Sequence, residues 1–196
     1  LLASQNLQQA PGVSCTLRNR RGAVLDWLPF PGGFVSAIGV DPDTGDIWVA
    51  DSRLVTSSTY RIWRFASTLD HLDTIEVTLH GTPAGLTFWP DCPAVQPPET
   101  LLLISNEATN VIQKVRRDGT SEGAFPLRLD AVLEEGFEEP PKAGALEYDP
   151  GNGPYFLAVL DTEYQHIVWV NENGYPPADG ATGVKRVCAP SEISGI

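Results

Sequence analysis

The chain has 196 residues, of which 42% are hydrophobic and 19% are charged, so it can bury a core and does not have a disordered composition. Its 13 basic and 25 acidic residues give a net charge of −12, which argues against nucleic acid and anionic membrane surfaces as partners. No apolar stretch approaches the roughly 18 residues of a membrane-spanning helix, and no segment has the pattern of a signal peptide.

Two features of the composition bear on processing and location. The chain begins at Leu1 and contains no methionine, which predicts a processed form or part of a longer polypeptide. Low lysine content and loops rich in proline and glycine favour an extracytoplasmic or secreted location. Cys15, Cys92 and Cys188 are 77 and 96 residues apart and match no compact zinc or redox motif. This count fits either one disulfide with one remaining thiol or three buried thiols.

In chain order, the first predicted strands lie in the N-terminal segment. Val13, Cys15 and Leu17 alternate with polar residues, as in a strand with one buried face. Arg20-Arg21-Gly22 then predicts a turn, and residues 23–28 predict an edge strand. This segment therefore reads as part of a larger sheet unit.

A six-residue phrase then recurs along the chain. Its copies are Ala37-Ile-Gly-Val-Asp-Pro42, Gly85-Leu-Thr-Phe-Trp-Pro90 and Ala145-Leu-Glu-Tyr-Asp-Pro150, spaced 48 and 60 residues apart. Gly195-Ile196 matches the start of a further copy. Repeats of this length that carry several short strands are typical of a β-propeller.

Each copy of the hexamer is followed by the same succession of elements. A turn rich in proline, glycine and aspartate leads into a strongly apolar second strand that ends in a polar residue. These polar residues are Asp51, Asn106 and Asp161, spaced 55 and 55 residues apart. Third strands are predicted at 61–65, 111–115 and 166–170. Hairpin turns at Arg117-Asp-Gly119 and Glu172-Asn-Gly174 follow the second and third of them, and the alternating segment 74–79 predicts a fourth, outer strand.

The predicted fold is thus all-β, a β-propeller of four-stranded antiparallel blades. The whole chain, 1–196, is read as one propeller domain or propeller segment. The predicted whole blades are 34–80, 82–142 and 143–189, and the predicted partial blades are 13–30 and 193–196. Since closed propellers need about four to eight blades, the ring is predicted to be incomplete, with strand edges that a partner covers.

The order of these phrases resembles NHL-repeat propellers and the wider six-bladed group of gluconolactonase-like and strictosidine-synthase-like proteins. In the lactonases of that group, the resemblance implies a divalent metal held by an Asn or Asp just before each Gly-Leu pair. The matching positions here are Ser36, Ala84, Gly144 and Ser194. Two of these four residues have no side-chain ligand for a hard cation, which argues against that metal site. No catalytic, cofactor-binding or metal-binding residue is therefore assigned.

Several other polar and aromatic residues could take part in catalysis or binding, but structural roles are predicted for them. The turn Asp41-Pro-Asp-Thr-Gly-Asp46 only loosely resembles a calcium loop and is predicted to be a strand-connecting turn. The glutamates of the insertion 127–142 are predicted to be solvated. Asp51, Asn106 and Asp161 are predicted to bond the backbone at blade turns, with a channel-facing binding role as the alternative. The histidines, His71, His80 and His166, lie in no nucleophile motif. The tryptophans within strands are predicted to pack between blades: Trp48, Trp63, Trp89 and Trp169.

Two functional hypotheses follow from the repeats. The first is a non-catalytic propeller that acts as a binding or structural module through protein–protein contacts, without a cofactor and without membrane insertion. The alternative is a lactonase- or esterase-like hydrolase with its catalytic groups partly outside this segment. Fold alone does not decide between them, because propellers carry many chemistries.

Overall fold

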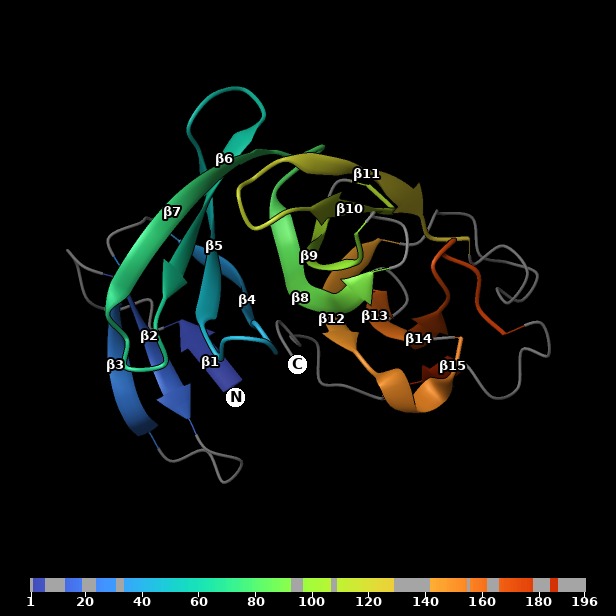
Figure 1. Ribbon diagram of the computed structural model, residues 1–196, viewed down its shortest axis with the longest axis horizontal. Coiled ribbons are helices and arrows are strands. Elements are labelled where there is room, and N and C mark those ends of the chain that lie inside the picture. Colours follow the sequence, from blue (N-terminus) through green and yellow to red (C-terminus); the bar gives the residue numbers. More distant parts are fainter. Residues whose placement is uncertain are drawn as a thin grey trace.

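The computed structural model describes residues 2–5, 13–18, 24–30, 34–92, 97–106, 109–128, 142–154, 156–161, 166–177 and 184–186. Strands in this part of the chain form four antiparallel sheets (Figure 1). The predicted all-β propeller fold with four-stranded antiparallel blades is confirmed. No helix in the described ranges is long and apolar enough to cross a membrane.

The N-terminal sheet and the first whole blade come first in the chain. The N-terminal sheet has the order β1-β2-β3 and consists of β1 (Leu2–Gln5), β2 (Val13–Arg18) and β3 (Val24–Phe30). The sequence did not predict β1, because its four residues lack an apolar alternation. Blade 1 has the order β4-β5-β6-β7 and consists of β4 (Val35–Val40), β5 (Ile47–Leu54), β6 (Thr59–Phe65) and β7 (His71–Thr78).

The next two sheets repeat the same order. Blade 2 consists of β8 (Pro83–Cys92), β9 (Glu99–Asn106), β10 (Val111–Val115) and β11 (Ser121–Pro126). Blade 3 consists of β12 (Ala143–Tyr148), β13 (Leu157–Asp161), β14 (His166–Val170) and β15 (Val184–Arg186). The acidic part of the predicted insertion, with Glu134, Glu135, Glu138 and Glu139, and the predicted partial blade 193–196 lie outside the described residues.

The hexamers form the innermost strands. In Figure 1 the strands β4, β8 and β12 lie near the middle of the view, and β8 contacts both of the others. Their side chains alternate between the two neighbouring sheets. Leu86 and Phe88, at the second and fourth positions of the hexamer, pack in one core cluster with blade 1. Trp89, at the fifth position, packs in another cluster with blade 3. Even positions thus face the preceding sheet, and the fifth position faces the following one.

Both faces of the middle blade are buried by this alternation. Leu102 joins the cluster shared with blade 1, whereas Leu103 joins the cluster shared with blade 3, and both are 0% exposed. A strand that is apolar on both faces reads as a continuous apolar run, which explains the sequence Leu101-Leu-Leu-Ile104. We call the contact of blades 1 and 2 the first joint and that of blades 2 and 3 the second joint.

The turns at 117–119 and 172–174 also serve as contacts between blades. The first joins β10 to β11 as predicted, but the second is not a tight hairpin turn, because β14 ends at Val170 and β15 begins at Val184. Gly119 and Gly174 adopt positive φ angles of 92° and 79°, as turns of this kind require. A Cβ on Gly119 would lie 2.9 Å from the Glu76 carbonyl oxygen of blade 1. A Cβ on Gly174 would collide with the Pro126 carbonyl of blade 2. In both joints a turn glycine of one blade therefore rests on the outer strand of the preceding blade.

Candidate functional site

The turn between β4 and β5 gathers three aspartates at the end of an inner strand. Its backbone is closed by bonds from the Gly45 N–H to the Asp41 carbonyl (2.8 Å) and from the Asp41 N–H to the Asp46 carbonyl (2.9 Å). The Asp41 carboxylate also accepts the Asp43 N–H at 2.9 Å. Gly45 takes a φ of 75°, which suits glycine in this turn. The turn therefore holds Asp41, Asp43 and Asp46 in fixed positions.

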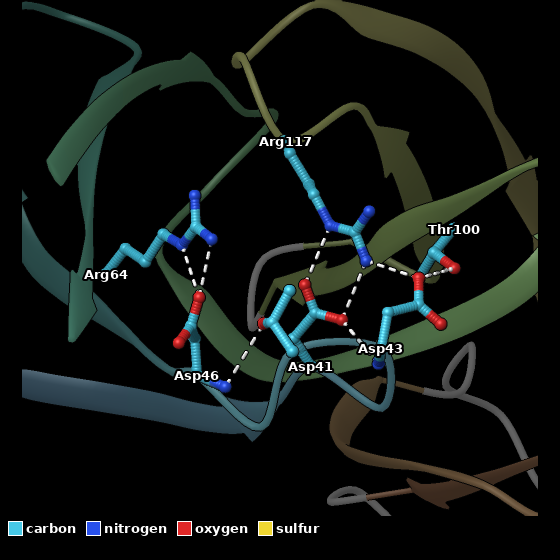
Figure 2. Close-up of polar contacts among 7 residues, drawn as sticks. Asp41, Asp43, Asp46, Arg64, Thr100 and Arg117 are labelled. Carbon is cyan, nitrogen blue, oxygen red and sulfur yellow. Dashed lines mark hydrogen bonds and ion pairs between the residues drawn. The ribbon is translucent and has the colours of Figure 1, made fainter. Parts of the chain in front are cut away.

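Two arginines bind these carboxylates (Figure 2). Arg117, from the turn between β10 and β11, donates from Nε and Nη2 to the two oxygens of Asp41, each at 2.7 Å. Its Nη2 also lies 2.6 Å from Asp43 Oδ2. Arg64 of β6 donates to Asp46 Oδ2 at 2.8 Å and 2.5 Å. We call the cluster of Asp41, Asp43, Asp46, Arg64, Arg117 and Thr100 the aspartate clamp.

The clamp links the two blades of the first joint. Arg117 reaches across from blade 2, and Thr100 of β9 donates its hydroxyl to Asp43 Oδ2 at 2.6 Å. Asp41 is 0% exposed, so the bidentate guanidinium is what offsets the loss of its hydration. The predicted connecting turn is therefore also an ionic contact between blades, and its carboxylates are bound by arginine.

Protonation in the clamp follows these contacts. Hydrogen bonds from Thr100 and Arg117 lower the pKa of Asp43 below its ordinary 3.8. Burial opposes ionisation of Asp46, yet hydrogen bonds from Arg64 and Thr44 still lower its pKa. Burial likewise opposes the charge on Arg117, but Asp41 and Asp43 raise its pKa. Asp43, Asp46 and Arg117 are thus held in their charged forms.

The fifth hexamer position carries a different contact in each blade. Asp41 binds Arg117 of blade 2, while Trp89 stacks at 4.5 Å on Phe156 of blade 3. Asp149 accepts the Trp169 indole N–H within its own blade at 3.1 Å and the Gly151 N–H at 3.0 Å. The same place in the repeat is therefore ionic in the first joint and aromatic in the second.

A second polar link in the first joint comes from Gln113, which is 4% exposed on β10. Its Oε1 accepts the His80 N–H at 2.9 Å, and its Nε2 donates to the Thr78 carbonyl at 3.1 Å. The side-chain amide thereby pairs with the backbone at the end of β7 as a short strand would. The sequence reading missed both Gln113 and Arg117. The one sequence signal for Gln113 is its place as a polar residue at the centre of the predicted third strand 111–115.

The polar residues that end the second strands occupy equivalent places. Asp51, Asn106 and Asp161 lie opposite the first residues of the inner strands, namely Val35, Pro83 and Ala143. Asp51 is 3% exposed and accepts the backbone N–H groups of Phe34 (3.2 Å) and Arg53 (2.9 Å). Asn106 donates to the Val111 carbonyl at 3.4 Å and accepts the Thr109 hydroxyl at 2.8 Å. The side chain of Asp161 lies outside the described part of the molecule.

In blade 1 this strand end presents exposed apolar side chains, which the sequence reading also missed. Phe34 is 52% exposed and Leu54 is 54% exposed. The Phe34 backbone is held by Asp51 and by the Ser52 N–H, which donates to its carbonyl at 2.8 Å. The Arg53 guanidinium lies 3.4 Å from the Asp51 carboxylate, with 55% of its side chain exposed. We call Phe34, Arg53 and Leu54 the blade 1 corner.

The positions that match lactonase metal ligands have other surroundings here. The Ser36 hydroxyl donates to the Ala50 carbonyl at 3.4 Å. Gly144 is buried, and its carbonyl accepts the Ser105 hydroxyl across the second joint. Ser194 lies outside the described residues. Within the described ranges, no three His, Cys, Asp or Glu side chains are grouped so that they could hold a metal ion.

The tryptophans, histidines and cysteines considered in the sequence do not form one common site among the described residues. Trp48 packs edge-on against Phe88 across the first joint, with ring centroids 6.0 Å apart. Trp63 packs against the cluster on the other face of blade 1, beside the ring of His71. His80 is exposed, and Cys92 is buried. The side chains of Cys15, Cys188 and His166 are outside the described residues.

Comparison with known proteins supports the fold and no closer relationship. No protein-family model and no curated protein sequence matches the chain. Solved structures do match it. A Bacteroides caccae protein of unknown function has 14% identity and a TM-score of 0.54, with 85% of this chain and 56% of that one covered. A putative 6-phosphogluconolactonase from Bacteroides fragilis has 13% identity and a TM-score of 0.51, with 93% and 51% covered.

A third similar structure is the periplasmic gluconolactonase of Pseudomonas aeruginosa, with 12% identity, a TM-score of 0.51, and coverage of 94% of this chain and 54% of that one. The chain thus spans about half the length of each of these structures. At such low identity the likeness concerns the fold alone. The chain has a β-propeller fold similar to that of these proteins.

Proposed function

We propose that this chain is a non-catalytic β-propeller module that binds another protein. The observation that carries the proposal is the blade 1 corner. There, a buried carboxylate, Asp51, holds the backbone of an exposed phenylalanine and an exposed arginine in place. Aromatic and arginine side chains are enriched where proteins bind each other, and a rigid anchor loses little conformational entropy on binding.

The polar groups of the described joints support the same proposal. Arg117 of the aspartate clamp, Ser105 and Gln113 are all engaged in contacts between blades. These groups stabilise the scaffold by binding neighbouring blades. The proposal also includes an extracytoplasmic location, which fractionation of the source cells would test.

Cross-linking in the native source, followed by mass spectrometry, tests this function. We expect cross-links from one partner protein to converge on residues near 34 and 52–58, at fixed stoichiometry. The double variant Phe34→Ala/Leu54→Ser should lose that partner. The variant Leu72→Ser is the control, because Leu72 is equally exposed (49%) but lies on the outer strand β7. Equal binding by both variants would contradict the proposal, as would lactone or ester hydrolysis that rises and falls with a stoichiometric divalent metal.

A further inference from the structure

Arg53 of the blade 1 corner binds its carboxylate less closely than the other arginines with described side chains do. Arg64 and Arg117 each donate at least two hydrogen bonds to carboxylates, none of them longer than 2.8 Å. Arg53 instead reaches Asp51 Oδ2 from Nη2 at 3.4 Å, the longest of the described ion pairs. Since a guanidinium carries several N–H donors, most of those on Arg53 remain available to another molecule.

The Asp51 carboxylate does not depend on this guanidinium, because backbone groups also bind it. Its Oδ1 accepts the Phe34 N–H at 3.2 Å and the Arg53 N–H at 2.9 Å. Asp51 is buried, whereas the Arg53 side chain is more than half exposed. A second anion can therefore bind the guanidinium from the solvent side while Asp51 keeps its backbone donors.

Phe34 lies beside Arg53, because the backbone N–H groups of both residues bind the same oxygen of Asp51. The Phe34 carbonyl is bound as well, by the N–H of Ser52 at 2.8 Å and by its hydroxyl at 3.3 Å. Hydrogen bonds thus fix the Phe34 backbone on both sides, while its side chain is exposed. The corner therefore presents a fixed apolar ring next to a guanidinium with unused donors.

We propose that the partner bound at the blade 1 corner presents a carboxylate to Arg53 and a neighbouring apolar side chain to Phe34; this inference rests on the proposed function. The carboxylate belongs to an acidic side chain or to the C-terminus of the partner, since both offer the same planar pair of oxygens. A planar guanidinium binds such a pair through two parallel hydrogen bonds. The apolar contact contributes buried area, and the ion pair fixes the orientation of the partner.

A carboxylate suits the blade 1 corner better than a phosphate group does. The chain carries a net charge of −12, and the Asp51 carboxylate lies 3.4 Å from the guanidinium. A phosphate group carries about −1.5 to −2 charges, so these negative charges repel it nearly twice as strongly as they repel a carboxylate. Sites that recognise phosphate groups on proteins use clusters of arginines, whereas the blade 1 corner offers Arg53 alone.

A screen of short random peptides against the full chain tests this partner chemistry. We expect the selected peptides to carry a carboxylate next to a leucine, isoleucine or phenylalanine. Arg53→Gln should weaken their binding about tenfold, because charge-assisted hydrogen bonds are lost. Arg53→Lys should weaken it less, because the charge remains without the planar fork. Arg61→Gln is the matched control, since Arg61 is similarly exposed (45%) but pairs with Glu76, and this variant should bind the peptides unchanged.

A double-mutant cycle tests whether the two charges touch. Conversion of the peptide carboxylate to its amide should weaken binding to the unaltered protein about tenfold but change binding to Arg53→Gln little. Amidation of the peptide C-terminus alone distinguishes a terminal carboxylate from an acidic side chain.

Additive losses in the cycle would overturn the proposal, as would a screen that selects no peptide, peptides without a carboxylate, or peptides that bind more tightly when phosphorylated. The proposed function would survive each of these results, because it depends on whether Phe34→Ala/Leu54→Ser loses the native partner.

Discussion

The two joints of blade 2 are built from the same repeat but are held together differently. The first joint combines an apolar cluster with the aspartate clamp and the Gln113 amide. The second joint combines an apolar cluster with the ring contact of Trp89 and Phe156 and three hydrogen bonds between uncharged groups, none of them part of an ion pair. Because apolar burial is common to both, the polar contacts are what distinguish them. The comparison shows that a repeat can preserve backbone geometry while its contact chemistry changes from one interface to the next.

The largest expected difference between the joints concerns their turn glycines. Gly174→Ala should lower the free energy of unfolding by about 3–5 kcal/mol, because the new methyl collides with the Pro126 carbonyl in a left-handed conformation. Gly119→Ala should lower it by about 2–3 kcal/mol, because its contact is less close.

Gly123→Ala is the control for these two variants. Gly123 has a φ of 93°, but nothing lies within 4 Å of a Cβ built on it. The Gly123→Ala variant should therefore lose only the free energy due to backbone strain, about 1–2 kcal/mol. Urea unfolding of the three variants measures whether their losses of unfolding free energy fall in this order. If all three lost the same free energy, the turns would not be contacts between blades.

Leu102 and Leu103 sharpen the comparison, since they are neighbours in sequence but belong to opposite joints. Replacing either with alanine should cost about 3 kcal/mol, because both are fully buried. The variants should differ in where the structure loosens. Hydrogen exchange should accelerate in β5 and β6 for Leu102→Ala and in β13 and β14 for Leu103→Ala. Identical exchange maps would show that the two clusters behave as one core.

Removal of the clamp arginine should affect the first joint alone. Arg117→Met leaves the buried Asp41 carboxylate without its guanidinium and should cost about 2 kcal/mol, less than a fully buried pair because Arg117 is partly exposed. Arg61→Met is the matched control, since the Arg61–Glu76 pair is exposed and should contribute below about 0.5 kcal/mol. Equal losses of unfolding free energy in the two variants, measured by urea unfolding, would show that the clamp does not stabilise the first joint.

The smallest expected effect is the response to acid. The pKa values of Asp43 and Asp46 are lower in the folded protein than their ordinary 3.8, so each binds protons less readily when folded. Their contribution to stability is therefore fully present above that ordinary value and is lost as pH falls through the lowered pKa values. Stability measured from pH 6 to pH 2.5 should decline less steeply in Arg117→Met than in the unaltered protein. Parallel curves would contradict this assignment.

The repeat made the strands and their order predictable, because apolar periodicity and turn residues are local signals. The 55-residue spacing of Asp51, Asn106 and Asp161 also placed them in equivalent positions opposite the inner strands. Asp51 and Asn106 also bond the backbone at these strand ends, as predicted. The long-range partner of the turn residue Asp41 was not predictable in the same way. Arg117 lies 76 residues from Asp41, and no local pattern connects the two. Phe34 is the first residue of the predicted blade 34–80, and only the structure shows that its side chain is exposed.

The Gln113 side chain has a consequence for the solubility of the molecule. Outer strands of propeller blades leave backbone groups unpaired by their own sheet, and such edges promote aggregation when another chain can pair with them. By binding the Thr78 carbonyl and the His80 N–H, this amide caps the end of the outer strand of blade 1. One buried amide thus occupies two backbone groups with which another strand could pair, and a chain with leucine in its place should self-associate more readily as its concentration rises.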